Sequence, residues 1–179
     1  MKDGKPNRIK YLFLILLLIS TFGLCSCVVE EDDTIEKTSI TKEQTIEKFV
    51  ITETKDGKIK TILEAKSAII YEDKKIAYLT LPKVKFYEEG KYKSTLIAET
   101  GEINLNTNNI KAFGKCSVDT VENEHLQTRD VTYNANKKII YSDNDIQITR
   151  GKDVIYGKGF KSDIDLNNIE IKHQKITID

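Results

Sequence analysis

Outside the amino-terminal segment, only Cys116, His125 and His173 carry side chains suited to nucleophilic or metal chemistry beyond the ordinary acids and lysines. The two histidines are 48 residues apart, and no cysteine or acid joins them at a spacing typical of a metal site. Cys116 lies in Gly-Lys-Cys-Ser-Val, which indicates a small buried strand residue rather than an activated nucleophile. The sequence contains no nucleophile motif and no phosphate-binding loop. We therefore predict no catalytic residue, no cofactor and no metal.

Two further cysteines follow an apolar segment near the amino terminus. Residues 1–26 carry a net charge of +3, and Tyr11–Leu24, a run of 14 residues, is almost wholly apolar. This pattern is typical of a secretory signal peptide. A single-pass transmembrane anchor is the alternative, but the run is shorter than the ~20 residues that a spanning helix needs.

The sequence Leu24-Cys25-Ser26-Cys27 resembles the lipobox, at which bacterial lipoproteins are cleaved and acylated. Leu24 stands three residues before Cys27 and the small Ser26 directly before it, whereas Cys25 fits the pattern poorly. The resemblance implies that residues 1–26 are a lipoprotein signal peptide and that a lipid on Cys27 anchors the chain in a membrane. An ordinary signal peptide with incidental cysteines is the alternative.

The charge balance differs between the two parts of the chain. The whole sequence has 28 basic and 28 acidic side chains, which argues against a nucleic-acid-binding protein. After cleavage, residues 27–179 would carry a net charge of −3. Residues 27–47 are polar and have no long apolar pattern, so we predict a tether there and a single domain over residues 48–179.

From Phe49 onward, apolar residues alternate with polar ones, for example around Val84 and Phe86. This period of two predicts strands with one face turned to a core. Residues 27–179 contain 22 isoleucines but only 7 leucines and 6 alanines, and branching at Cβ favours strands over helices. Turn signals, such as Asp56-Gly57 and Ser142–Asp145, recur between the runs, as expected for an antiparallel all-β domain.

A short pattern recurs along these predicted strands: an apolar residue, a polar turn and then isoleucine. It occupies Tyr71–Ile76, Leu105–Ile110, Tyr133–Ile139 and Ile164–Ile169. A repeat of about 30 residues is typical of stacked units that cannot bury their apolar faces alone. We therefore predict strand–turn–strand repeats with an unpaired edge at each end, where another chain could add a strand. A closed sandwich with capped ends is the alternative.

Seven segments, in a fixed order, carry a resemblance to a known family. They are Phe49–Lys58, Glu64–Ala68, Pro82–Tyr87, Ala98–Ile103, Ala112–Val118, Tyr141–Ile146 and Gly157–Phe160. Together they resemble the LptC family of lipopolysaccharide export proteins and its soluble LptA and OstA relatives, over most of the predicted domain. The resemblance implies an all-β fold, an antiparallel β-jellyroll or twisted boat, with an apolar groove for the acyl chains of lipopolysaccharide.

The resemblance also implies a location and partners. The chain would be anchored on the periplasmic side of the inner membrane, receive lipopolysaccharide from inner-membrane ABC transporter subunits and pass it to a periplasmic LptA-like bridge protein. Many members keep a transmembrane helix where this chain has a lipobox. Val28 stands where Asp is associated with inner-membrane retention in enterobacteria, so inner-membrane and outer-membrane sorting both stay open. A structural or adhesive surface lipoprotein without lipid transport is the alternative function.

Alternation and resemblance together select the candidate site residues. Those expected to face the lipid-binding groove are Val84, Phe86, Ile103, Leu105, Val118, Val131, Tyr133, Ile146 and Ile148. For each of them, ordinary core packing is the alternative. The expected docking edge for a partner consists of Gly157, Gly159, Ile169 and Ile171, where the glycines would allow a bulge or a close backbone approach.

Overall fold

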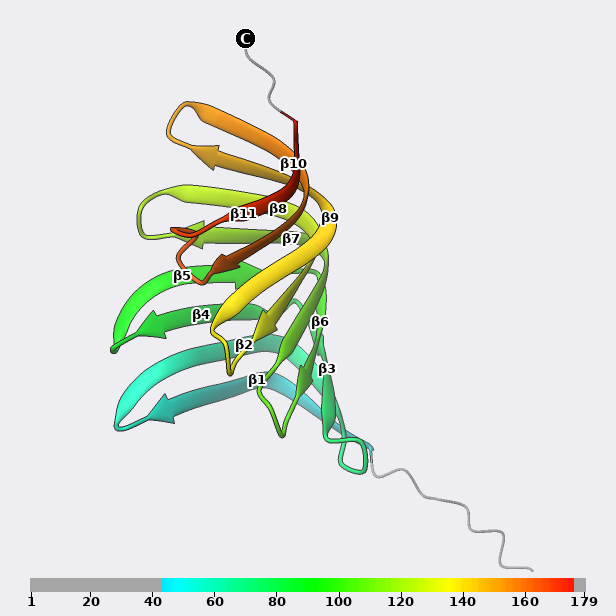
Figure 1. The fold of residues 1–179 in the computed structure, drawn as a ribbon. Coiled ribbons are helices and arrows are strands. Elements are labelled where there is room, and N and C mark those ends of the chain that lie inside the picture. Colours follow the sequence, from blue (N-terminus) through cyan, green and yellow to red (C-terminus); the bar gives the residue numbers. More distant parts are fainter. Residues whose placement is uncertain (1–42, 176–179) are drawn as a thin grey trace, which may run out of the picture. The chain divides into compact units, whose positions relative to one another are not determined.

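A computed structural model describes residues 43–175, and these form eleven β-strands and no helix (Figure 1). All eleven strands belong to one antiparallel sheet, which confirms the predicted fold class. The predicted signal peptide and Cys27 lie outside the described residues. The strands are β1 Glu43–Lys55, β2 Lys58–Tyr71, β3 Ile76–Thr80, β4 Lys83–Glu88, β5 Lys91–Ile97, β6 Thr100–Asn104, β7 Ile110–Thr120, β8 Glu124–Asn134, β9 Ile139–Arg150, β10 Asp153–Asp163 and β11 Glu170–Lys175.

The long strands pair with two short strands in turn. The first half of β2 pairs with β4 and its second half with β3. The first half of β7 pairs with β6 and its second half with β5. β3 and β4 therefore act as one strand bent at Leu81-Pro82, and β5 and β6 as one strand bent at Ala98-Glu99. We call the half of the sheet that contains β4 and β5 wing A, and the half that contains β3 and β6 wing B. Each long strand runs through both halves, so it contributes one segment to each wing.

The bends between the wings have local causes in the backbone. Lys48, Leu81, Gly114 and Gly159 all have positive φ angles, of 53°, 50°, 94° and 73°. At Gly159 the pairing of β9 with β10 also shifts register, which marks a β-bulge. A bulge bends its strand and increases the local twist, so the sheet folds over and its two wings face each other.

The inward face of the sheet is apolar on both wings. Leu63 and Leu96 on wing A, and Ala77 and Ile103 on wing B, are at most 2% exposed. Val50, on the opposite face of β1, is 60% exposed. The predicted alternation of buried and exposed residues is therefore confirmed, and the sheet buries its apolar face against itself.

The repeated polar turns lie at corresponding ends of the strands. They join β2 to β3, β6 to β7, β8 to β9 and β10 to β11, at the outer ends of wing B. The Asp56-Gly57 turn between β1 and β2 is also confirmed. The turn expected at Ser142–Asp145 is wrong, because these residues lie within β9. There, the Ser142 hydroxyl donates to Asp130 at 3.0 Å and accepts from the Asn144 N–H at 3.0 Å, so polar residues are satisfied at a bend instead of a turn.

The expected docking edge is wrong for two of its four residues. Gly157 and Gly159 lie on β10, which pairs with β9 on one side and with β11 on the other. Ile171 lies on β11 and Ile169 just before it. A Cβ on Gly157 would approach the Ile171 Cγ2 to 2.6 Å and the His173 carbonyl oxygen to 3.0 Å. Gly157 therefore allows a close approach, as predicted, but it does so by letting β11 pack onto the sheet.

Each end of the sheet carries a strand with a single neighbour among the described strands. β1 pairs only with β2, and β11 only with β10, so the predicted unpaired edges are present. β1 begins at Glu43, inside the segment predicted as a tether. The tether prediction is wrong for residues 43–47, because strand pairing satisfies the backbone of this segment although its side chains are mostly polar.

We predict that Gly157→Ala destabilises the fold by about 1–3 kcal/mol, the usual cost of placing an extra group in a packed site. The added methyl group would displace Ile171 and the backbone at His173. Urea unfolding of the purified full-length protein measures the effect. Lys158→Ala, at an exposed neighbouring position, is the control. Equal midpoints for Gly157→Ala and the unchanged protein would contradict the packing argument.

Candidate functional site: the apolar interior

The predicted groove residues gather in one place, the interior between the two wings. Eight of the nine are at most 4% exposed, and Leu105, just after β6, is partly buried against them. Wing A contributes Val84, Phe86, Val118, Ile146 and Ile148, and wing B contributes Ile103, Val131 and Tyr133. The structure therefore brings together side chains that come from five strands.

Contact between aromatic rings closes the interior across the wings. The ring centroids of Phe86, on β4, and Tyr133, on β8, are 4.7 Å apart with the planes inclined at 53°. Such tilted pairs are favourable beyond the area that they bury. Side chains thus fill the middle of the interior, and an acyl chain can enter only where they move apart.

Several fully buried residues were not among the predicted groove residues. Most of them also lie on inward-facing strand positions, so the alternation could have found them. Leu166 is different, because it lies in a predicted polar turn and yet is 0% exposed. No local signal marks it, since its burial depends on the wing that faces it. The set consists of Leu63, Leu96, Leu126, Ile140, Phe160 and Leu166.

The mouth of the interior lies where the turns of wing B approach wing A. Two cavities, of about 170 Å³ and 500 Å³, share Lys138 and Ile164 in their walls. The smaller one reaches Tyr133 from the side of Tyr87, on β4, and the larger one lies beside Lys93, on β5. These cavities adjoin the apolar interior and are lined largely by polar side chains.

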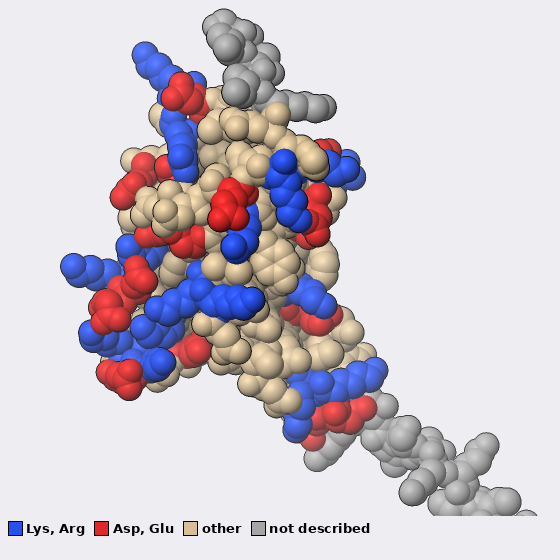
Figure 2. Space-filling model, viewed as in Figure 1, with Lys and Arg blue, Asp and Glu red and all other residues tan. Residues whose placement is uncertain are grey.

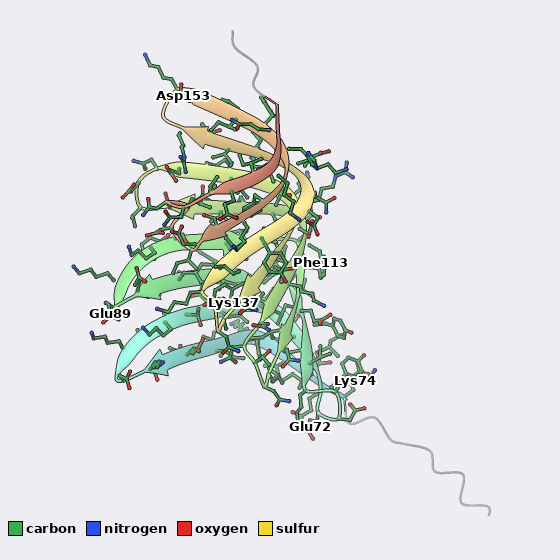
Figure 3. The ribbon with its side chains drawn as sticks, in the orientation of Figure 1. Glu72, Lys74, Glu89, Phe113, Lys137 and Asp153 are labelled. Carbon is green, nitrogen blue, oxygen red and sulfur yellow. The ribbon has the colours of Figure 1, made fainter. Side chains whose placement is uncertain are left out.

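Ion pairs join the two wings at this mouth. Lys138, on the β8–β9 turn, lies 3.9 Å from Glu88 on β4, and Lys93 lies 2.9 Å from Asp165 on the β10–β11 loop. Figure 3 shows Glu89 at the outer end of wing A and Lys137, next to Lys138, nearer the middle of the fold. Elsewhere on the face in view, charged side chains of both signs are mixed (Figure 2).

Burial raises the pKa values of two ionisable groups of the interior. Desolvation, and to a lesser extent the charge of Glu53, raises the pKa of the Tyr133 phenol to about 12. Desolvation, followed by the charge of Asp130, raises the pKa of the Cys116 thiol to about 12. Both groups are neutral at physiological pH, and the raised pKa values extend this neutrality to more alkaline pH.

Cys116 and His125, two of the residues considered for nucleophilic or metal chemistry, form hydrogen bonds with other residues and not with each other. Cys116 and His125 line one depression of about 410 Å³, but the Cys116 thiol donates to the Arg129 carbonyl oxygen at 3.6 Å. His125 instead pairs with Asp119, with 2.5 Å between Nδ1 and Oδ1. Within residues 43–175, no three histidine, cysteine or acidic side chains are grouped so that they could hold a metal ion.

Comparison with protein families agrees with this geometry. The family model described as "Lipopolysaccharide-assembly, LptC-related" matches residues 11–179. The chain belongs to the LptC family. As an LptC-related protein, it is a component of lipopolysaccharide transport, and the family is periplasmic and associated with the inner membrane. No curated protein matches the chain.

Residues 43–175 of this LptC-related chain include no helix long and apolar enough to cross a bilayer. The apolar run Tyr11–Leu24 lies outside these residues.

Proposed function

We propose that this LptC-related chain is a lipid-anchored, non-enzymatic carrier that holds the acyl chains of lipopolysaccharide between its wings. It receives the lipid from inner-membrane ABC transporter subunits and passes it to a periplasmic LptA-like bridge protein. The observation that carries this proposal is the continuous apolar face that wing A and wing B enclose, with an unpaired strand at each end of the sheet.

The proposed function rests on the movement of acyl chains between apolar environments of similar affinity. Each methylene group that leaves water for such an interior gains about 0.8 kcal/mol. Because neighbouring strands present similar apolar side chains, such as Val84, Leu96 and Val118, a bound acyl chain meets little change in affinity as it moves. The net direction then comes from the ATPase of the transporter, since this chain has no nucleotide-binding loop.

We predict that a photo-reactive amino acid at Ile148 captures lipopolysaccharide in cells when it is activated by light. Ile148 is 0% exposed and faces the interior. Gln147, its neighbour on β9, faces the opposite side of the sheet and is the matched control. Mass spectrometry of the cross-linked products measures capture. Equal capture at Ile148 and Gln147, or none at Ile148, would overturn the carrier function.

The two unpaired edges support docking by strand addition. β1 and β11 each present one side without a neighbour among the described strands, so each can extend the sheet with a strand from another jellyroll. Charged and polar residues on both strands, among them Lys48, Glu170 and Lys172, discourage pairing with arbitrary chains. We propose that one edge meets the transporter subunits and the other meets the bridge protein, with Ile169 and Ile171 belonging to the docking edge at β11.

We predict that cross-linkers at Thr52 on β1 and at Gln174 on β11 capture two different partner proteins. Both side chains are exposed on edge strands. A cross-linker at Gln127, an exposed position on the internal strand β8, is the control and should capture neither partner. Immunoblotting for the transporter subunits and the bridge protein identifies the products. Capture of the same partner from both edges would contradict the two-edge arrangement.

The proposed anchor is a lipid on Cys27, followed by a polar tether that leads to β1. Acyl chains anchor a protein stably when two or more insert together. We predict that the mature protein begins with an acylated Cys27 and that Cys27→Ser abolishes acylation, whereas Cys25→Ser leaves it intact. Mass spectrometry of the amino-terminal peptide checks this. A peptide that still begins at Met1 would support the transmembrane anchor instead.

A further inference from the structure

The loop between β10 and β11 is buried where a polar turn would normally face solvent. Its residues Ile164 and Leu166 are 5% and 0% exposed, and Leu166 has a φ of 59°. A leucine in the left-handed region is unusual, because its Cβ is crowded there. The loop therefore holds an unfavourable backbone conformation in order to place Leu166 inside the fold.

Three contacts hold this loop against wing A. The Ser94 hydroxyl, on β5, donates to the Ile164 carbonyl oxygen. The Lys93 ammonium group donates to the Asp165 carboxylate at 2.9 Å. The Arg150 Nη2, on β9, donates to the Leu166 carbonyl oxygen at 2.7 Å. The loop is thereby tied across the mouth of the interior, and Figure 1 shows the β10–β11 connection in front of the β5 region.

The closed arrangement leaves two buried polar atoms without a hydrogen bond. Arg150 also forms an ion pair with Glu124, with 2.9 Å between Nε and Oε1. That contact is an ion pair without a hydrogen bond, so Arg150 Nε and the other Glu124 carboxylate oxygen are both buried without a hydrogen-bond partner among the described residues. An unpaired buried carboxylate oxygen is unfavourable. The Arg150 side chain that holds the loop at the Leu166 carbonyl oxygen is therefore itself incompletely satisfied in the closed arrangement.

We infer that Ile164–Leu166 is a removable plug, which closes the mouth of the interior in the empty protein and leaves it when an acyl chain enters. The inference rests on the proposed carrier function. The plug is the natural point of opening, because it is a short loop held by three polar contacts. The remaining closure, between Phe86 and Tyr133, lies on β4 and β8, which pair with a strand on each side and are therefore less free to move than a loop.

Release of the plug is tested with Asp165→Asn, which removes the charge that pairs with Lys93. Asp143→Asn is the matched control, because Asp143 pairs with Lys172 on the exposed surface. We expect amide hydrogen exchange of residues 164–166 in the full-length protein to become severalfold faster in Asp165→Asn and to stay unchanged in Asp143→Asn. Exchange in β4 should stay slow in both, which shows that the fold is intact. Unchanged exchange at 164–166 in Asp165→Asn and in Lys93→Met would overturn the plug.

A second experiment fixes the plug in place and tests whether the lipid can still enter. In Lys93→Cys/Asp165→Cys, a short reducible bifunctional thiol reagent joins the loop to β5, while the buried Cys116 thiol stays unreactive because its pKa is raised to about 12. We expect capture of lipopolysaccharide at Ile148 to fall severalfold after cross-linking and to return on reduction. Full capture in the locked protein would overturn the plug. A different result would separate the two proposals. If Ile148 captures no lipopolysaccharide even before cross-linking, while exchange at 164–166 is fast in Asp165→Asn, then the loop opens but neither the carrier function nor the role of the loop in lipid entry is correct.

Discussion

The fold depends on one constraint: a single sheet with one apolar face has no second layer among residues 43–175 to cover it, so it must fold onto itself. Bends with positive φ angles at Lys48, Leu81, Gly114 and Gly159 make this fold-over feasible, because they bend β1, the β3–β4 junction, β7 and β10 without ending the pairing along the sheet. The two wings then bury each other. Everything else in the molecule follows from this closure, including the apolar interior, the mouth where the wings meet again, and the two strand edges that the fold-over leaves unpaired.

Closure of this kind gives an interior and an entrance with different properties. The interior is held by paired strands and by apolar contact, so it is rigid and uniform. The mouth is closed by turns, which have few backbone partners and depend on ion pairs such as Lys93–Asp165. Ion pairs with partial exposure contribute little to stability. A carrier of acyl chains needs both a stable interior and a movable entrance, because the apolar walls must stay in place while the entrance opens and closes.

The unpaired edges connect this protein to its family's role in lipopolysaccharide transport. A closed barrel would shield its backbone groups but could not be extended, whereas an open stack offers one edge to each neighbour. Gly157 has an unexpected part in this arrangement. It lets β11 lie close to β10, so β11 and not β10 forms the carboxyl-terminal edge. The edge surface is therefore set by the fit of one strand onto a glycine.

The sequence by itself determined the strands, their inward faces and most of their turns, because the period of two and the Asn, Asp and Gly signals act within a few residues. It therefore predicted that Phe86, Val131 and Ile148 point inward and that both ends of the sheet are open. Only the tertiary structure decided what these faces meet. The Phe86–Tyr133 contact joins opposite wings, and Leu166 is buried although it lies in a predicted polar turn. Ser142–Asp145 form a bend, because Asp130 on the neighbouring strand β8 accepts a hydrogen bond from the Ser142 hydroxyl. Such contacts depend on where the sheet bends and by how much, and no local pattern carries that information.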